Sequence, residues 1–203
     1  MKRRIIAVVV MLVLLVCVTL LIEVPSVVKP PKMLTYTSEE LGFSIEYPED
    51  WGWEVIEGPL ETWVFFRSED PEEKNMCIAV MVKEDLPKEM DLEEFVETTI
   101  KEESQFYHKI KEYPTIINGK DAIVIIHEGS GYIWGAGTEV KWKEKVVHIV
   151  DDTTGYKLTC GASPPKIYIK ADKKYFDVIA QSFKCLPKLP TSTSTPTPPL
   201  STP

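Results

Sequence analysis

Apolar and polar residues alternate in several short stretches of this 203-residue chain. In one of them, Phe43, Ile45 and Tyr47 are separated by Ser44 and Glu46. Because successive side chains of a β-strand point to opposite faces, this pattern predicts a strand with one buried face. Related patterns predict further strands at 62–67, 75–83, 107–117, 122–127, 140–150 and 156–162. A β-sheet is therefore the main constraint on how the chain folds.

Two details refine the predicted sheet. The stretch 75–83 is apolar on both faces, which is typical of a central strand that is covered on two sides. Asn118-Gly119 separates two other predicted strands, and this dipeptide favours the tight turn of an antiparallel hairpin. The glycine-rich stretch 128–138 is interpreted as a long loop before the strand at 140–150.

Two segments have the period of an amphipathic helix. In the first, Asp91 is a candidate N-cap with Glu94 three residues later, and apolar residues then recur on one face. The second helix covers about 171–184. The order of strands, helix, strands, helix predicts an α+β domain. We expect an antiparallel sheet flanked by helices, an α/β/α sandwich.

An uncharged apolar stretch, Ile5–Ile22, precedes this domain. Eighteen helical residues span about 27 Å, close to the thickness of the hydrocarbon core of a bilayer. Lys2-Arg3-Arg4 precedes the stretch, which predicts a cytoplasmic N-terminus and a single-pass cell-membrane protein with its C-terminal domain extracytoplasmic. No A-x-A-like site follows, so a retained signal anchor is favoured over a cleaved signal peptide. A lipid-modified Cys17 is a further alternative.

The composition of the two ends defines the expected domain boundaries. Residues 1–22 form the cytoplasmic cap and the transmembrane helix, and 23–33 form a proline-rich linker. The α+β domain covers 34–186. Residues 187–203 form a Ser/Thr/Pro-rich tail that cannot build a core and is predicted to be disordered.

The charge of the chain limits its partners. The net charge is −8, with 23 Lys and Arg against 31 Asp and Glu. Such an acidic chain repels a phosphate backbone, so nucleic acid is not an expected partner. The membrane and a protein of unknown identity are the expected partners.

Three motifs occur in order along the region 34–186. They are Ser38-Glu39-Glu40-Leu41-Gly42-Phe43-Ser44-Ile45-Glu46-Tyr47-Pro48-Glu49-Asp50-Trp51, Asn118-Gly119 with Ala122, and 156–162 followed by Ser182-Phe183-Lys184. In these motifs and their spacing the region resembles the PsbP-like family. This resemblance implies the Mog/PsbP fold, described as an α/β/α sandwich, and a non-enzymatic binding or assembly role. It does not imply photosynthesis, because a fold alone carries no function.

The motifs of common enzymes and metal sites are not found in the sequence. His108, His127 and His148 have no metal-ligand spacing, although His148 with Asp151 and Asp152 is an alternative weak cation site. The glycines of 128–138 match neither a nucleophile elbow nor a P-loop. We therefore expect no enzyme, no cofactor and no metal. A small-ligand or ion-binding surface protein is the alternative function, and a hydrolase is a more distant one.

The middle of the glycine-rich loop carries the candidate partner-binding residues Tyr132, Ile133 and Trp134. Aromatic residues supply much of the binding energy of protein interfaces. The alternative is that these three side chains fold back over a sheet edge and complete the core.

Three cysteines lie in the predicted extracytoplasmic domain, where disulfides persist. Cys160 falls on the inward face of the last strand, and Cys185 follows the terminal helix that must pack on that strand. A Cys160–Cys185 disulfide is the expected pairing. The alternative is three free thiols, with Cys77 as a buried one.

Overall fold

A computed structural model describes residues 31–68, 70, 75–103, 107–132 and 139–187. The predicted transmembrane helix of residues 5–22 lies outside these residues, as does most of the predicted tail. Within the described residues, no helix is both long enough and apolar enough to cross a membrane.

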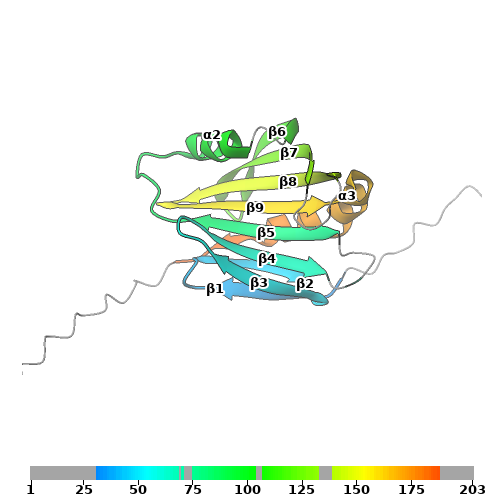
Figure 1. The fold of residues 1–203 in the computed structure, drawn as a ribbon. Coiled ribbons are helices and arrows are strands. Elements are labelled where there is room, and N and C mark those ends of the chain that lie inside the picture. Colours follow the sequence, from blue (N-terminus) through cyan, green and yellow to red (C-terminus); the bar gives the residue numbers. More distant parts are fainter. Residues whose placement is uncertain (1–30, 69, 71–74, 104–106, 133–138, 188–203) are drawn as a thin grey trace, which may run out of the picture. The chain divides into compact units, whose positions relative to one another are not determined.

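The described residues form two antiparallel sheets (Figure 1). The larger sheet consists, in spatial order, of β3 (Trp51–Glu57), β4 (Thr62–Ser68), β5 (Met76–Lys83), β9 (Thr154–Ala162), β8 (Glu139–Asp151), β7 (Lys120–Tyr132) and β6 (Tyr107–Ile117). The smaller sheet consists, also in spatial order, of β1 (Met33–Ser38), β2 (Phe43–Pro48) and β10 (Lys184–Cys185). The helices are α2 (Leu92–Glu103) and a continuous C-terminal segment made of α3 (Pro165–Ala171), η1 (Asp172–Phe176) and α4 (Asp177–Ser182).

The alternation in the sequence predicted β2 and β4 to β9, but not β1, β3 or β10. Phe43, Ile45 and Tyr47 are buried on β2, as expected from their spacing. The doubly apolar stretch 75–83 is β5, which lies between β4 and β9 in the larger sheet. Asn118 and Gly119 both have positive φ and connect β6 to β7 as a tight hairpin.

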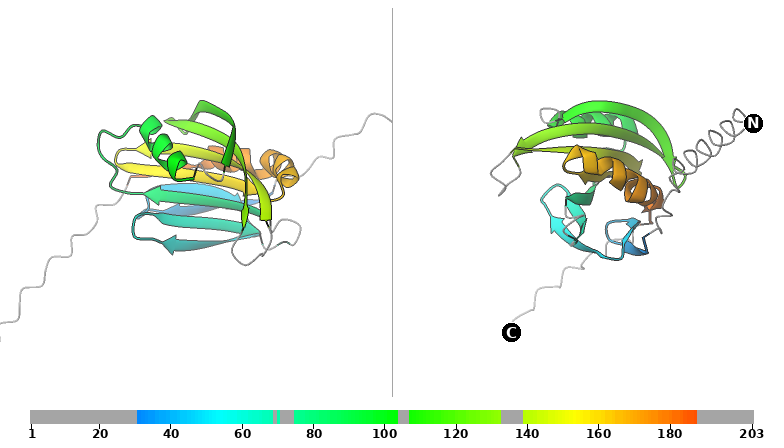
Figure 2. Two further views of the ribbon diagram at one scale, coloured as in Figure 1. Left: turned by 45° about the horizontal axis from the view of Figure 1, so that its top comes forward. Right: turned by 90° about the vertical axis from the view of Figure 1, so that its right-hand side faces the viewer.

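The predicted α/β/α sandwich is wrong, because the described residues are mostly β-structure and form two sheets. One face of the larger sheet is covered jointly by the C-terminal helix and by the smaller sheet, and Figure 2 shows this helix on the inner side of the curved larger sheet. On the other face, α2 lies against β7 and β8, and Leu86 of the preceding connection packs with Met81 of β5 and Phe95 of α2. The second sheet arises because of the connection Glu49-Asp50 between β2 and β3. This connection takes the chain from one sheet to the other, since β2 and β3 are not paired.

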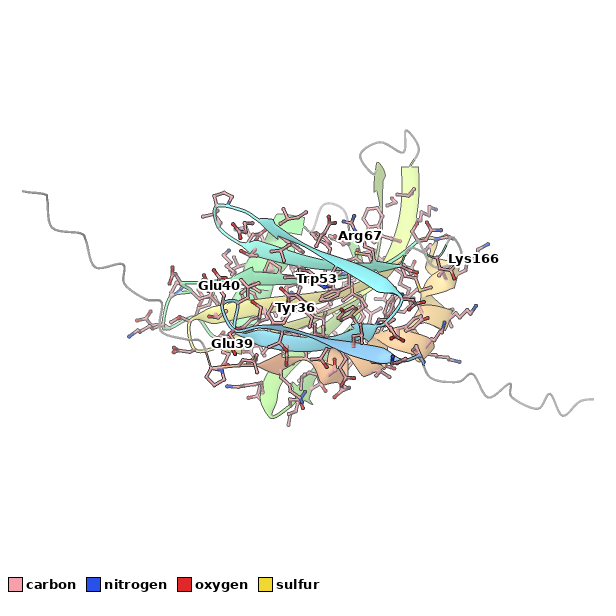
Figure 3. The ribbon with its side chains drawn as sticks, turned by 90° about the horizontal axis from the view of Figure 1, so that it is seen from below. Tyr36, Glu39, Glu40, Trp53, Arg67 and Lys166 are labelled. Atoms are coloured by element: carbon pink, nitrogen blue, oxygen red, sulfur yellow. The ribbon has the colours of Figure 1, made fainter. Side chains whose placement is uncertain are left out.

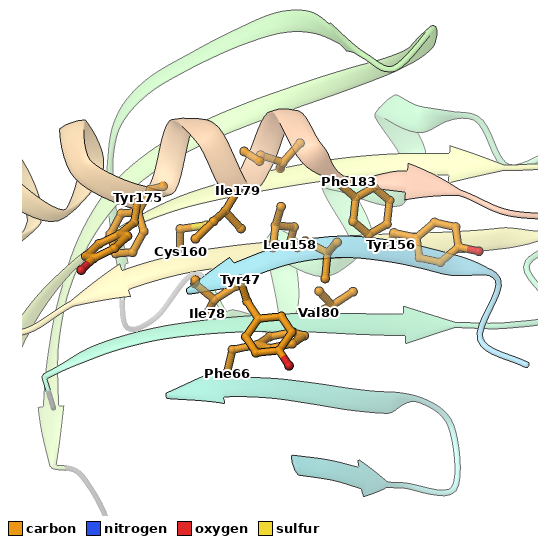
Figure 4. Packing of buried hydrophobic residues seen from close by; sticks show 14 of the residues in the cluster. Tyr47, Phe66, Ile78, Val80, Tyr156, Leu158, Cys160, Tyr175, Ile179 and Phe183 are labelled. Carbon is orange, nitrogen blue, oxygen red and sulfur yellow. The ribbon is translucent and has the colours of Figure 1, made fainter. Parts of the chain in front are cut away.

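The main core joins the two sheets and the C-terminal helix (Figure 4). Three aromatic rings meet there, and each comes from a different layer. Phe43 of β2 stacks on Phe183, which follows α4, at 5.6 Å between ring centroids. Tyr156 of β9 lies edge-on to Phe183 at 5.3 Å and to Phe43 at 6.2 Å. The Tyr156 hydroxyl also donates a hydrogen bond to the Gly42 carbonyl at 3.0 Å.

A second packing region lies between α2 and the opposite face of the larger sheet. The predicted cap is present, since the Asp91 carboxylate accepts a hydrogen bond from the Glu94 N–H at 2.8 Å. Farther along α2, the Thr99 hydroxyl lies 3.1 Å from Nε2 of His148 on β8. His148 is buried, and this burial together with the nearby Lys157 lowers the pKa of its imidazole to about 3. The ring is therefore neutral in the folded protein at neutral pH.

We predict that His148 makes the domain sensitive to mild acid. As the pH falls below about 6.5, the unfolded chain binds a proton at this histidine, whereas the folded protein does not until about pH 3. Between pH 7 and pH 5 this difference lowers the free energy of unfolding by roughly 2 kcal/mol. Urea unfolding at both pH values measures the loss. The His148→Gln variant should lose about 2 kcal/mol less than the wild type, and equal losses in both proteins would contradict the prediction.

Candidate functional site

The β7–β8 hairpin extends past the strands on either side of it. The two strands pair with each other as far as Tyr132 and Glu139. Pairing of β6 with β7 ends at Gly129, and pairing of β9 with β8 ends at Lys143. Residues 130–132 and 139–142 therefore form a two-stranded extension that pairs with no third strand among the described residues. The predicted loop 128–138 is consequently shorter than expected, because β7 continues to Tyr132.

Two glycines of β7 make room for an indole at the base of this extension. Trp142 of β8 pairs with Gly129, and a Cβ atom on Gly129 would lie 2.6 Å from the Trp142 ring. A Cβ atom on Gly131 would lie 3.3 Å from the same ring. Gly129 and Gly131 are two residues apart on one face of a strand, so together they form a flat surface under the ring.

An aromatic and ionisable group of side chains continues this packing into the sheet. Nε2 of His127 lies 3.0 Å from a carboxylate oxygen of Glu144, the residue directly opposite on β8. The Tyr107 ring lies 4.1 Å from the His127 ring and 6.0 Å, edge-on, from that of Trp142. His127 is buried, and the Glu144 side chain is mostly buried. These four side chains, which we call the hairpin base, hold β6, β7 and β8 together where the extension begins.

Sequence reasoning missed the hairpin base. It interpreted 128–138 as a loop, whereas β7 continues to Tyr132 and the register places His127 opposite Glu144. The available signal was the spacing of Gly129 and Gly131, which suits a strand face under a large ring as well as it suits a loop. Among the described residues, no three His, Cys, Asp or Glu side chains are grouped as ligands of a metal ion.

One of the three predicted partner-binding residues, Tyr132, lies at the far end of the described extension. Tyr132 is the last residue of β7 and pairs with Glu139. Ile133 and Trp134 lie outside the described residues.

The cysteines of the predicted disulfide occupy different ends of β9. Cys160 is fully buried on β9, whereas Cys185 lies beside Asp151, which pairs with Thr154 at the start of that strand. The six residue-to-residue steps from Thr154 to Cys160 span about 20 Å along the strand, and a disulfide requires Cα atoms within about 7 Å. Cys77, Cys160 and Cys185 are free thiols in this structure. The geometry therefore does not favour the Cys160–Cys185 bridge.

We predict that these three thiols are free but slow to react in the folded protein. Burial raises the pKa of Cys77 and of Cys160, and burial together with Asp151 raises the pKa of Cys185 to about 12. Since the thiolate is the nucleophile, iodoacetamide should leave Cys160 unmodified in native protein at pH 8. In denaturant without a reductant, all three should be alkylated. A Cys160–Cys185 linked peptide in an unreduced digest would contradict this prediction.

We also predict that position 129 must be glycine to leave space for the Trp142 ring. Gly129→Ala should lower the free energy of unfolding by about 1–3 kcal/mol, because the new methyl group overlaps the indole. Gly131→Ala should cost less, since its Cβ atom has more room. In a Trp142→Ala background, the cost of Gly129→Ala should almost disappear. Chemical unfolding of the double-mutant cycle measures this coupling, and equal costs in both backgrounds would show that the ring is not the cause.

Comparisons with known proteins support the fold described above. No protein-family profile matches the chain, and no curated protein matches it. The structure is similar to cyanobacterial PsbP (CyanoP) from Synechocystis sp. PCC 6803, with a TM-score of 0.54 and 16% identity over 81% of this chain and 98% of that chain. Weaker similarities are found to a Bacteroides thetaiotaomicron protein (TM-score 0.45, 10% identity, 74% of this chain and 47% of that one) and to protein PA94 of Pseudomonas aeruginosa (TM-score 0.39, 14% identity, 70% and 89%). The described domain therefore has a PsbP-like fold.

Proposed function

We propose that this protein is a membrane-anchored, extracytoplasmic binding or assembly module without enzymatic activity, and that its β7–β8 extension contacts a partner protein. The observation that supports this proposal most directly is the extension itself. Within the part of the chain that the structure describes, its two strands pair with each other alone beyond Gly129 and Lys143, so it projects from the larger sheet. A PsbP-like fold is compatible with such a role.

The architecture of the extension suits recognition. The sequence places Tyr132, Ile133 and Trp134 at its end, and large aromatic side chains dominate the energetics of protein interfaces. The hairpin base fixes the strands where they leave the sheet. A support that is already ordered reduces the entropy lost on binding, so more of the contact energy is available for affinity.

The proposed location follows from the N-terminal sequence. Ile5–Ile22 is long enough to span a bilayer as a helix, and Lys2-Arg3-Arg4 favours retention of its N-terminal end in the cytoplasm. The PsbP-like domain then lies on the outer side of the cell membrane. Residues 23–33 connect it to the anchor, and residues 187–203 extend from it as a tail.

The experiment that tests partner binding is crosslinking in intact membranes followed by affinity capture of the full chain. We expect one defined partner to be recovered with the wild type and at least tenfold less with Tyr132→Ser/Trp134→Ser. The melting temperature of the variant should stay nearly unchanged, because in this proposal the two side chains contact the partner and do not pack in the core of the domain.

A matched control replaces two exposed apolar side chains away from the extension. Trp53 on β3 is 53% exposed and Leu60, in the connection to β4, is 79% exposed. Trp53→Ser/Leu60→Ser should capture the partner as the wild type does. Two outcomes would refute the proposal. One is unchanged capture by the Tyr132/Trp134 variant, and the other is a fall of many degrees in its melting temperature, which would identify these residues as part of the core.

A further inference from the structure

The C-terminal helical segment distributes its charges unequally. Its two acidic residues, Asp172 and Asp177, both bind the ammonium group of Lys145 on β8. Lys145 is buried. Burial lowers the pKa of Lys145, but the hydrogen bonds to Asp172 and Asp177 outweigh this effect and raise the pKa above its ordinary value. One buried cation therefore binds both carboxylates of the segment.

The exposed side of this segment is mainly cationic: the Asp177 side chain is also 71% exposed, but its carboxylate is paired with Lys145. Lys166, Lys170 and Lys173 are exposed, and their spacing of four and three residues places them on one helical face. Ile169 lies among them and is 61% exposed. The face is extended by Lys141, which is exposed and whose carbonyl accepts a hydrogen bond from the Ser163 hydroxyl at 2.8 Å, just before α3 begins. We call these five residues the lysine face.

The lysine face is positively charged, whereas the chain as a whole is negatively charged. Figure 3 places Lys166 at one end of the molecule and Glu39 and Glu40 at the opposite end. Glu39 and Glu40 are exposed, and the whole chain has a net charge of −8. A planar anionic surface would therefore attract one end of the domain and repel the other, which gives the domain a preferred orientation.

The N-terminal end of the domain is close to the lysine face. Lys32 precedes β1, and its carbonyl accepts a hydrogen bond from the Glu49 N–H at 2.9 Å. Two residues after Glu49, the Trp51 ring packs on Tyr175 of η1 at 5.6 Å. Between Ile22 and Lys32 lie nine residues, which reach at most about 30 Å. An anchor in the membrane therefore keeps this end of the domain near the bilayer surface.

We propose that the lysine face docks on the anionic headgroups of the bilayer that holds the N-terminal anchor. This proposal rests on the membrane anchoring proposed above. Lys141, Lys166, Lys170 and Lys173 bind lipid phosphates, and Ile169 enters the interfacial layer among them. Each lysine near an anionic surface strengthens docking by roughly fivefold, so reversal of three of them weakens it by at least about 100-fold.

The test uses the full chain reconstituted in vesicles and measures hydrogen exchange of the peptides that cover Pro165–Ser182. With vesicles of phosphatidylcholine containing about one third phosphatidylglycerol, we expect slower exchange of this segment than with pure phosphatidylcholine. The protection should disappear in 1 M salt, where the Debye length is only about 3 Å. It should also disappear in Lys166→Glu/Lys170→Glu/Lys173→Glu, and the matched control Lys88→Glu/Lys111→Glu/Lys184→Glu, which reverses three exposed lysines elsewhere, should keep it.

The outcomes separate this proposal from the anchoring. Resistance of the protein to alkaline extraction reports the anchor alone, since it does not depend on the lysine face. If the protein is extracted, anchoring fails, and sedimentation of the same chain with the two kinds of vesicle then decides whether the lysine face binds anionic lipid. Equal exchange on both kinds of vesicle, or protection that survives the triple reversal, would overturn the docking proposal. Protection in native membranes but not on phosphatidylglycerol vesicles would do the same and would indicate an acidic protein as the occupant.

Discussion

The contact among Phe43, Tyr156 and Phe183 holds the layers of this domain together. Each ring comes from a different part of the fold: the smaller sheet, the larger sheet and the end of the C-terminal helix. Neither the helix nor the smaller sheet covers the inner face of the larger sheet alone, so each depends on the other for its place. Polar bonds fix the same junction. The Tyr156 hydroxyl binds the Gly42 carbonyl, and the Asn118 amide, in the β6–β7 turn, binds the carbonyls of Gln181 and Phe183 at 2.8 and 2.7 Å.

Local rules predicted the elements of the fold, and the long-range contacts decided the layers. Strand period, the Asn118-Gly119 turn and the Asp91–Glu94 cap are properties of a few neighbouring residues, and the structure agrees with each of them. The assignment of β1 and β2 to a second sheet is not local. It depends on Phe43 meeting Phe183 from the far end of the chain, and no pattern near Phe43 encodes that partner. This is why an α/β/α sandwich was expected and a two-sheet structure is found.

The candidate site was also predicted only in part, because local patterns reveal some of its residues and the pairing of distant residues decides the others. The aromatic stretch that begins at Tyr132 is visible in the sequence, and the structure places Tyr132 at the end of the β7–β8 extension. The hairpin base below it depends on register. The strand continues five residues beyond the end predicted at His127, and in the resulting register Glu144 lies opposite His127. Glycine is usually read as a loop residue, but at Gly129 it provides the space that the Trp142 ring occupies.

The β7–β8 extension and the lysine face belong to the same end of the domain. The Ser163 hydroxyl joins the start of α3 to Lys141, which is itself part of the extension. A domain that docks through its lysine face therefore brings the extension close to the bilayer surface. Under the two proposals, the partner that the extension contacts is then itself at the membrane, within reach of a hairpin that the hairpin base keeps in a fixed direction. Lys145 contributes to this arrangement from the interior, because it binds Asp172 and Asp177 and so offsets the negative charge that these two residues add to the lysine-bearing helix.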